Sequence, residues 1–394
     1  MLAVSTGNSI RATAPKSAAR AQILISDDQQ DILMALSLLL KLNNYATESV
    51  DTPQQALDSI RKRNFDLVLM DLNYSRDTTS GREGLELLAK LRQSGVSAPI
   101  VVMTAWGNVE LAVEAMRLGA NDFVQKPWDN HRLLNTLETQ LTRAEKAERR
   151  QRQAQSELEI ARKVQQKLLP QALQRIAGLE FAALCTPARE VGGDYYDFFE
   201  MGESRLSGVV ADVSGKGVAA AMLMANLQAC FRSQMDNGLK EPTELLRSIN
   251  RLFHASTPAE QYVTLFYFEY EVASRRLRYV NCGHLAPVLL RADGKVERLD
   301  ATSTVLGLFP HCSCECGEAQ LRERDVLTIF TDGVSEFTGR NGEEFGEERF
   351  ISLVQSARTL TPDAALRHIA EQLAIERNGN DQFDDQTIVL LRPS

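Results

Sequence analysis

The sequence contains no apolar run of about 18 residues, the length expected of a membrane-spanning helix. Positive charge is in the minority, because 44 Lys and Arg stand against 52 Asp and Glu, for a formal net charge of −8. An acidic surface repels nucleic acid and anionic lipid, and no helix-turn-helix pattern is present. We therefore expect a soluble, cytoplasmic protein that has neither nucleic acid nor a membrane as its partner.

Cysteine is scarce, with six residues in 394, and no secretory signal is apparent, so we expect a reducing compartment and free thiols. Three of the cysteines alternate in the segment HCSCEC, residues 311–316. If this segment is an extended strand, Cys312, Cys314 and Cys316 project from one face about 7 Å apart. That spacing favours packing over a tetrahedral zinc site, which is the weaker alternative.

The chain is long enough for two or three domains. Residues 1–20 are rich in Ala, Ser and Thr and contain no acid, which predicts a disordered tail rather than a transit peptide. From Ala21 onward, short apolar runs alternate five times with helical patterns. This alternation predicts an α/β domain over residues 21–137, with a five-stranded, doubly wound parallel sheet.

Polar residues stand where the predicted strands of this domain end. The first strand ends in Asp27 and Asp28, the third in Asp71, the fourth in Thr104 and the fifth in Lys126. The carboxyl ends of parallel strands share one edge of the sheet, and three carboxylates that meet there repel one another unless a cation neutralises them. Mg²⁺ suits such a site, and the hydroxyl and ammonium groups suit a phosphoryl group carried by an aspartate.

These residues resemble the receiver domain of bacterial response regulators over residues 21–137. The resemblance implies that Asp71 is the phosphoacceptor and that a cognate histidine kinase is the partner. It also implies that Asp27, Asp28 and Asp71 hold Mg²⁺ together with the main-chain carbonyl of Asn73.

The same resemblance assigns the other parts of the phosphorylation switch. Thr104 and Lys126 contact the phosphate, Phe123 occupies the aromatic switch position, and the bond from Lys126 to Pro127 is a candidate cis peptide. One departure is visible, because the loop that follows the phosphoacceptor, residues 73–84, is longer than is usual in the family. We therefore expect an unusual partner surface beside it.

Residues 138–170 read as a helical linker. The chain is highly charged from about residue 133, contains no Gly, and reaches its first Pro at Pro170, which predicts one helix of about 38 residues. Two short apolar seams run along it, Leu134, Leu137, Leu141 and Ala144 first, and Ala154, Leu158, Ala161, Gln165 and Leu168 second. We expect these seams to form a parallel coiled-coil homodimer; packing on the chain's own domains is the alternative.

Residues 171–394 predict an α+β domain. Strand-like runs follow one another in hairpin-like succession with helical patterns between them, which is typical of two antiparallel sheets flanked by helices. Four aspartates stand at the ends of these runs: Asp194, Asp212, Asp332 and Asp385. Brought together, they would form a site for two Mn²⁺ or Mg²⁺ ions that share a bridging carboxylate and activate water for attack on phosphorus.

These motifs, in this order, resemble the metal-dependent PPM serine/threonine phosphatases, in particular the SpoIIE/RsbU branch of bacterial regulators. The runs ARKVQQKLLP and NCGHLAP match that branch too, so the resemblance covers nearly all of residues 155–394. It implies a phosphoserine protein as substrate, commonly an anti-sigma-factor antagonist. The ligands that it implies are Asp212 between both ions, Asp194 and the Val213 carbonyl at one ion, and Asp332 and Asp385 at the other.

The roles of four neighbouring residues stay open at this point. Asp197 and Asp384 could support the metal ligands or be ordinary surface acids, and Lys216 could meet substrate phosphate or lie in solvent. His284 fits a hairpin turn better than it fits a general acid.

Two functions follow from the sequence. The first is an enzyme, a response regulator whose output is a protein serine/threonine phosphatase controlled by phosphorylation of Asp71. The alternative is a phosphorylation-gated adaptor that binds a sigma-factor regulator through a catalytically silent phosphatase-like domain. Because adaptors of that kind tend to lose metal carboxylates, the four aspartates favour the enzyme.

Overall fold

The computed structural model of the chain describes residues 21–74, 81–105, 109–170, 176–202, 204–236 and 241–394. The chain divides into two compact units, residues 1–154 and 155–394. None of the helices in these described ranges combines the length and the apolar composition needed to cross a membrane.

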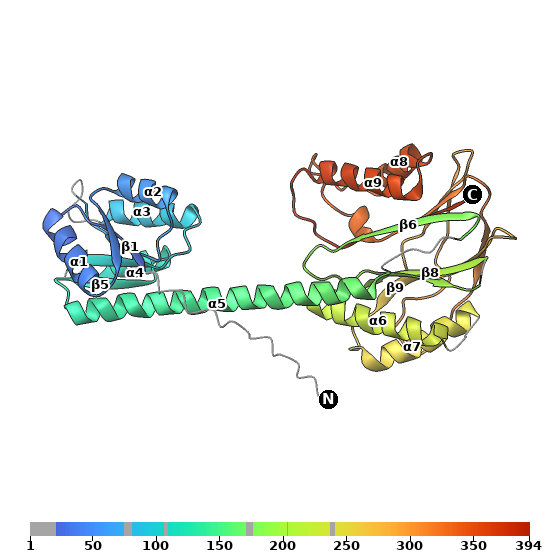
Figure 1. The fold of residues 1–394 in the computed structure, drawn as a ribbon, viewed down its shortest axis with the longest axis horizontal. Coiled ribbons are helices and arrows are strands. Elements are labelled where there is room, and N and C mark those ends of the chain that lie inside the picture. The colour runs from blue at the N-terminus through green and yellow to red at the C-terminus, as the bar shows by residue number, and fades with distance from the viewer. Residues whose placement is uncertain (1–20, 75–80, 106–108, 171–175, 203, 237–240) are drawn as a thin grey trace, which may run out of the picture. The chain divides into compact units, whose positions relative to one another are not determined.

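The first unit contains a five-stranded parallel sheet with the order β2-β1-β3-β4-β5 (Figure 1). Its strands are β1 (Gln22–Ser26), β2 (Ala46–Val50), β3 (Leu67–Asp71), β4 (Ile100–Ala105) and β5 (Asp122–Lys126). Its helices are α1 (Gln30–Leu42), α2 (Pro53–Lys62), α3 (Arg82–Gln93), α4 (Val109–Arg117) and the first part of α5 (Asn130–Leu168). The predicted α/β sheet is therefore confirmed.

Helices cover both faces of this sheet, as its almost wholly apolar strands require. On one face, Val68 packs in a core with Leu88 of α3, and α2 and α4 contribute to the same core. On the other face, Ile25 packs in a core that contains Leu137 and Leu141 of α5 together with residues of α1. The first seam of α5 thus packs on the domain to which it belongs, with Leu137 and Leu141 buried and Leu134 and Ala144 half-buried.

The connector is one helix of 39 residues, α5, which ends two residues before Pro170 and confirms the predicted long helix. In its second seam Leu158, Ala161 and Gln165 are half-buried, and Leu168 packs against the core of the second unit. Packing on the chain's own domains therefore accounts for much of the burial of the apolar residues in both seams. The homodimer through α5 stays a prediction.

The second unit contains two five-stranded antiparallel sheets. The first has the order β13-β10-β9-β8-β7 and the second the order β12-β11-β14-β15-β6. The strands of the first are β7 (Tyr195–Glu200), β8 (Arg205–Val213), β9 (Val263–Glu271), β10 (Arg276–Cys282) and β13 (Gly317–Gln320). Those of the second are β6 (Leu179–Thr186), β11 (Val288–Leu290), β12 (Val296–Arg298), β14 (Val326–Phe330) and β15 (Gln386–Pro393).

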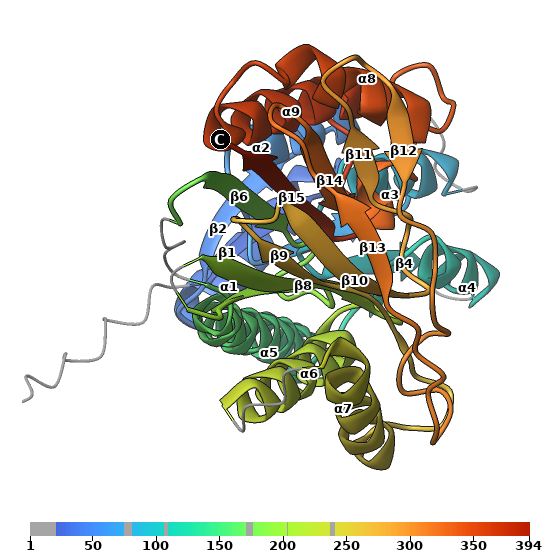
Figure 2. The ribbon, with the colours of Figure 1, turned by 90° about the vertical axis from the view of Figure 1, so that its right-hand side faces the viewer.

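The two sheets face each other, and helices cover their outer faces (Figure 2). A core that contains Phe266 and Phe268 from the first sheet and Ile329 and Val389 from the second fills the space between them. The helices α6 (Val218–Asp236) and α7 (Pro242–Ser256) pack on the first sheet. The helices α8 (Glu347–Ala357) and α9 (Pro362–Arg377) pack on the second. This arrangement confirms the two predicted sheets flanked by helices.

The structure corrects the prediction for the cysteine segment, residues 311–316. Residues 312–316 form no strand, since β13 begins only at Gly317. Without the extended spacing, Cys312 and Cys314 approach with a Cα–Cα distance of 5.8 Å and form a disulfide, whereas Cys316 is free. The expectation of a strand with three free thiols is therefore wrong for this segment.

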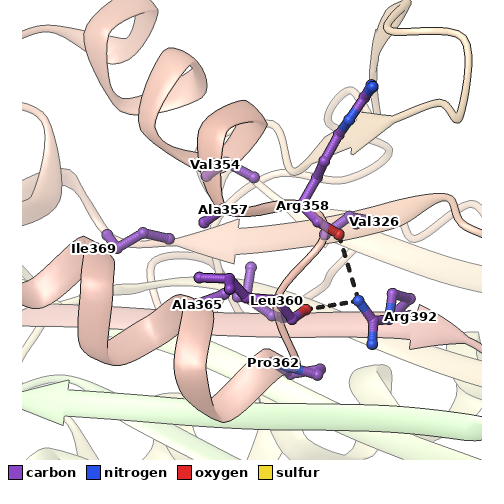
Figure 3. Close-up of a pocket in the computed structure, with 10 residues that line it drawn as sticks. Val326, Val354, Ala357, Arg358, Leu360, Pro362, Ala365, Ile369 and Arg392 are labelled. Atoms are coloured by element: carbon purple, nitrogen blue, oxygen red, sulfur yellow. Dashed lines mark hydrogen bonds between the residues drawn. The ribbon is translucent and has the colours of Figure 1, made fainter.

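A small apolar cavity lies beneath α8 and α9, with Ala365 and Ile369 among the residues that line it (Figure 3). Arg392 stands at its edge and donates hydrogen bonds to the carbonyl oxygens of Arg358 and Leu360, at 3.4 and 2.6 Å. The cavity has a volume of about 10 Å³, which is room for roughly one water molecule. The cavity is thus a packing feature rather than a ligand site.

Candidate functional sites

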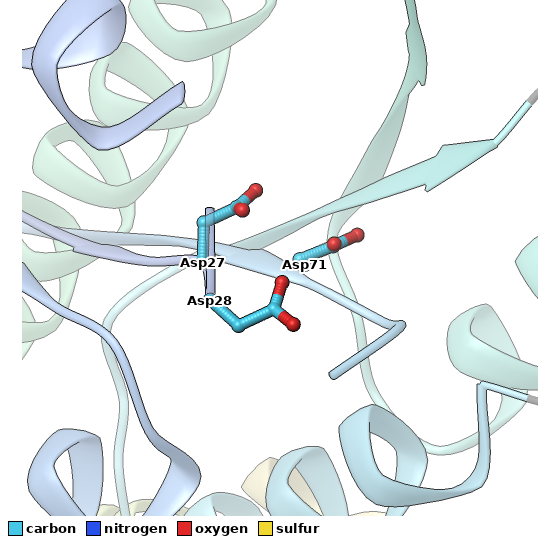
Figure 4. A group of neighbouring side chains, drawn as sticks. All are labelled: Asp27, Asp28 and Asp71. Carbon is cyan, nitrogen blue, oxygen red and sulfur yellow. The ribbon is translucent and has the colours of Figure 1, made fainter. Parts of the chain in front are cut away.

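The first acidic group lies at the carboxyl edge of the parallel sheet. Asp27 and Asp28 follow β1, and Asp71 is the last residue of β3. The three side chains each offer an oxygen within 4.8 Å of the others (Figure 4), and Asp27 and Asp71 are buried. The sequence prediction that parallel topology brings these carboxylates together is borne out by this geometry.

Lys126, at the end of β5, compensates part of this negative charge. Its Nζ lies 2.6 Å from Oδ2 of Asp27 and 2.8 Å from Oδ2 of Asp71. Burial raises the pKa of Asp71, and the neighbouring Lys126 charge opposes that rise. One ammonium group among three carboxylates leaves net negative charge, so this oxygen-rich group fits Mg²⁺.

The other predicted switch residues lie on β4 and β5, the two strands that follow β3 in the sheet. Thr104 is buried at the end of β4, and Phe123 on β5 is 41% exposed. The peptide bond from Lys126 to Pro127 is cis, as predicted. Part of the long loop after the phosphoacceptor, residues 75–80, lies outside the described residues.

Sequence reasoning missed Tyr74 in this region. Tyr74 is buried, and its hydroxyl lies 2.7 Å from Oγ of Ser26, the last residue of β1. This contact fastens the start of the loop that follows Asp71 to the neighbouring strand. The adjacent Asn73, whose main-chain carbonyl is a predicted ligand, has a buried Oδ1 without a hydrogen-bond partner.

The second acidic group draws its members from both antiparallel sheets. Asp194 directly precedes β7 and Asp212 lies near the end of the adjacent β8. Asp332 begins a short 3-10 helix after β14, and Asp385 directly precedes β15, which pairs with β14. The fold therefore gathers four carboxylates that lie as far as 191 positions apart in the sequence at one end of the sandwich.

These carboxylates lie close enough together for their charges to act on one another. Burial, followed by the charges of Asp212 and Asp385, raises the pKa of Asp194 well above its usual value. Burial, followed by the charges of Asp332 and Asp384, raises the pKa of Asp212 to about 7. Within the described residues only the receiver group meets the 4.8 Å spacing, so the second group is wider.

Two threonines fix the orientation of Asp194. The hydroxyl groups of Thr331 and Thr387 donate to its Oδ2 at 2.8 and 2.6 Å. These donors stabilise the ionised form, although burial outweighs them. Because both threonines belong to the β14–β15 side of the sandwich, they lock the two sheets together at the acidic group.

Asp384 and Asp385, adjacent in sequence, have different surroundings. Oδ1 of Asp385 accepts from the Ala188 backbone N–H at 2.7 Å, and its Oδ2 accepts from that of Gly193 at 2.6 Å. Asp384 instead pairs with Lys216 at 2.7 Å, and its charge raises the pKa values of Asp212 and Asp332. The charges of both residues therefore act on the cluster, but backbone N–H groups hold the Asp385 carboxylate, whereas the Asp384 carboxylate has a side-chain partner.

Two basic residues lie on loops that adjoin this cluster. Lys216 is tied to the Asp384 loop, because its Nζ also donates to the Phe383 carbonyl at 3.1 Å and lies 3.7 Å above the Phe383 ring. Arg189 is exposed, and its guanidinium lies beside Gly217, where a Cβ would stand 3.6 Å from Nη1. Among the described contacts, Arg189 makes no hydrogen bond or ion pair.

His284 is held in the turn that follows β10. Its backbone N–H donates to Oδ1 of Asn281 at 2.8 Å, and its Nδ1 lies 3.1 Å from Oγ1 of Thr264. Burial lowers the pKa of His284 to about 4, so the ring is neutral near neutral pH. These contacts support a structural role in the turn.

Two families match the chain. The response regulator receiver domain matches residues 23–138, and the family described as Stage II sporulation protein E (SpoIIE) matches residues 202–394. The first match covers the parallel sheet of the first unit, and the second covers the second unit from the end of β7 onward. The first match contains the Asp71 group, and the second contains Asp212, Asp332 and Asp385 but begins after Asp194.

Individual relatives agree with this division. The phosphoserine phosphatase RsbU of Bacillus subtilis is 29% identical over 250 residues, which cover 61% of this chain and 71% of RsbU. The phosphoserine phosphatase RsbP of the same organism is 32% identical over 186 residues, or 46% of each chain. The chain thus spans less than half of RsbP.

A solved structure supports the fold of the second unit. The SiaA-PP2C domain of Pseudomonas aeruginosa matches with a TM-score of 0.56 at 21% identity, and the match covers 62% of this chain and 98% of that domain. At this identity the likeness shows the fold alone. The family matches and the relatives identify this chain as a member of the response regulators that carry an N-terminal receiver domain and a C-terminal SpoIIE-type PP2C phosphatase domain similar to RsbU and RsbP.

Proposed function

We propose that this protein hydrolyses phosphoserine or phosphothreonine in a protein substrate, that the reaction depends on Mn²⁺ or Mg²⁺, and that phosphorylation of Asp71 controls it. The observation that carries the proposal is the mutually repelling group formed by the buried Asp194 and the half-buried Asp212 and Asp332. Repulsion among these carboxylates destabilises the fold, and a protein that only binds a partner has no need for such a group. The adaptor is therefore the weaker hypothesis.

The chemistry of these residues fits divalent cations. Asp194, Asp212, Asp332 and the Val213 carbonyl would hold the ions, with Asp212 shared between them. Divalent cations in such a site supply Lewis-acid chemistry that activates water toward phosphorus. For the remaining ligand, predicted as Asp385, the geometry favours Asp384, because backbone N–H groups occupy both oxygens of Asp385.

Arg189 is our candidate for the contact to substrate phosphate. Its guanidinium lies beside Gly217, on the loop that follows Asp212, is exposed, and makes no hydrogen bond or ion pair with another described residue. A guanidinium binds a phosphoryl group with two parallel hydrogen bonds. Lys216 is the weaker candidate, because Asp384 and Phe383 already occupy it.

In the receiver domain, Asp27, Asp28 and Asp71 would hold Mg²⁺ with the Asn73 carbonyl, and a histidine kinase would phosphorylate Asp71. Thr104 and Lys126 would then contact the phosphate, with Phe123 as the aromatic switch. The substrate class that the resemblance to the SpoIIE/RsbU branch implies is an anti-sigma-factor antagonist. A homodimer through α5 would use its exposed Ile160 and Val164.

The test is release of inorganic phosphate from a phosphoserine protein by the full chain with Mn²⁺. We expect hydrolysis that EDTA abolishes and that Asp212→Asn reduces by about 100-fold or more. Arg247→Ala, an exposed substitution on α7, is the matched control and should leave the rate unchanged. Activity that survives Asp212→Asn would contradict the metal site.

A further inference from the structure

Gln165, near the C-terminal end of α5, pairs with both backbone groups of Gly192. Its Nε2 donates to the Gly192 carbonyl oxygen at 2.7 Å, and its Oε1 accepts from the Gly192 N–H at 3.1 Å. The same Nε2 lies 3.8 Å from Sδ of Met224 on α6. One side chain of the connector helix therefore satisfies a buried backbone unit that has no strand partner.

The acidic residues lie against the other side of this backbone. A Cβ on Gly192 would overlap the carboxylate of Asp385, whose Oδ2 accepts from the Gly193 N–H at 2.6 Å. A Cβ on Gly193 would stand 3.0 Å from the Val213 carbonyl oxygen. The two glycines thus lie between α5 and the acidic cluster, and Asp194 follows them directly.

A second contact joins α5 to the same loop. Nε2 of Gln155 donates to Oε1 of Glu190 at 3.2 Å. This contact is exposed, so its contribution is small. The pairing of Gln165 with Gly192 is therefore the contact of α5 through which a shift of the helix would reach the cluster most directly.

We propose that Gln165 is a positioning residue: by holding Gly192 it fixes the backbone that presents Asp194, so that affinity for divalent cations depends on how the end of α5 is seated. The inference rests on the proposed function, because it concerns the same site. Its physical basis is that the buried N–H and C=O of Gly192 lose their partners when Gln165 is removed, which favours a rearranged loop.

The test compares the full chain with Gln165→Met, which keeps the length and apolar contact of the side chain but not its hydrogen bonds. Gln165→Ala serves as a second variant, and Lys163→Ala, an exposed change on the same helix, is the control. Hydrogen exchange of the peptide that covers residues 187–195 is followed by mass spectrometry over a range of Mn²⁺ concentrations. Thermal unfolding shows that each variant is folded.

We expect metal-free exchange of this peptide to be at least about threefold faster in Gln165→Met, and half-protection to require about tenfold more Mn²⁺. Phosphatase activity, where present, should show the same rise in half-saturating Mn²⁺ with a maximal rate within about twofold of wild type. Unchanged exchange, or an unchanged Mn²⁺ requirement, would overturn the inference. Because the exchange measurement needs no turnover, it decides the inference even if the phosphatase proposal fails.

Discussion

Arg232 of α6 holds the buried Asp197 of β7 in a bidentate ion pair, with Nε and Nη2 at 2.8 and 2.6 Å from the two carboxylate oxygens. The Tyr195 hydroxyl donates to the same carboxylate at 2.9 Å. Asp197 therefore binds α6 to the sheet rather than supporting a metal. The sequence alone left these two roles open.

Loss of this pair should destabilise the second domain. We expect Arg232→Ala to lower the free energy of unfolding by about 2 kcal/mol, because Asp197 stays buried without its charge partner while the half-exposed arginine keeps the cost moderate. Urea unfolding measures the change, and Arg247→Ala is the control. A change within about 0.5 kcal/mol would show that the pair contributes little.

Replacement of Asp212 should separate stability from activity. Because burial and neighbouring charges raise the pKa of Asp212 to about 7, its ionised form destabilises the metal-free fold. We expect Asp212→Asn to raise the free energy of unfolding in EDTA at pH 8 by about 2 kcal/mol while it removes activity. A destabilised variant would argue that Asp212 is a structural residue.

The neighbouring pair Asp384 and Asp385 should give two different phenotypes. Asp384→Asn should raise the Mn²⁺ requirement about tenfold or more without loss of stability, since it removes a carboxylate that faces the cluster. Asp385→Asn should lower the melting temperature, because it weakens the acceptor of the Ala188 and Gly193 N–H groups. Identical behaviour of the two variants would refute this division of roles.

Acid should destabilise the fold through His284. Its pKa is about 4 in the folded protein against an ordinary 6.5, so the unfolded chain binds the extra proton between these values. The neutral ring therefore makes its whole contribution to the free energy of unfolding above pH 6.5. As the pH falls towards 4, up to about 3 kcal/mol of this contribution is lost. Urea unfolding at pH 5 and pH 7.5 should show a smaller difference for His284→Asn than for wild type.

Arg189 should affect substrate binding more than folding. We expect Arg189→Ala to lower kcat/KM for a phosphoserine peptide by about 10- to 100-fold, the value of a charge-assisted hydrogen-bond pair, with an unchanged melting temperature. Arg189→Lys should recover only part of the loss. Normal kinetics in Arg189→Ala would remove this residue from the phosphate site.

The receiver group could be predicted because topology dictates it. Parallel strands place Asp27, Asp71 and Lys126 at one edge of the sheet regardless of their side-chain contacts. The alternation of strands and helices was therefore enough to predict that these residues lie together. The four aspartates of the second domain were likewise recognisable at strand ends. Their convergence needed the pairing of β7 with β8 and of β14 with β15, which sequence periodicity does not specify.

Finer features depended on local backbone direction and on tertiary contacts. Whether Asp384 or Asp385 faces the cluster is decided by a single residue step where β15 begins, which no sequence pattern reveals. Gln165 looked like one member of an apolar seam, because its partner Gly192 is distant in sequence and is contacted through its backbone. The Cys312–Cys314 disulfide does not follow from the sequence, because the alternating pattern of HCSCEC predicts an extended strand.

The central claim is that Asp71 controls a metal-dependent phosphatase site. The most direct measurement is the rate of phosphate release from a phosphoserine protein with Mn²⁺, with and without acetyl phosphate, for wild type and Asp71→Ala. The account predicts that acetyl phosphate changes the wild-type rate several-fold and leaves the Asp71→Ala rate unchanged. No phosphate release from the wild type in any metal or phosphorylation state would contradict it.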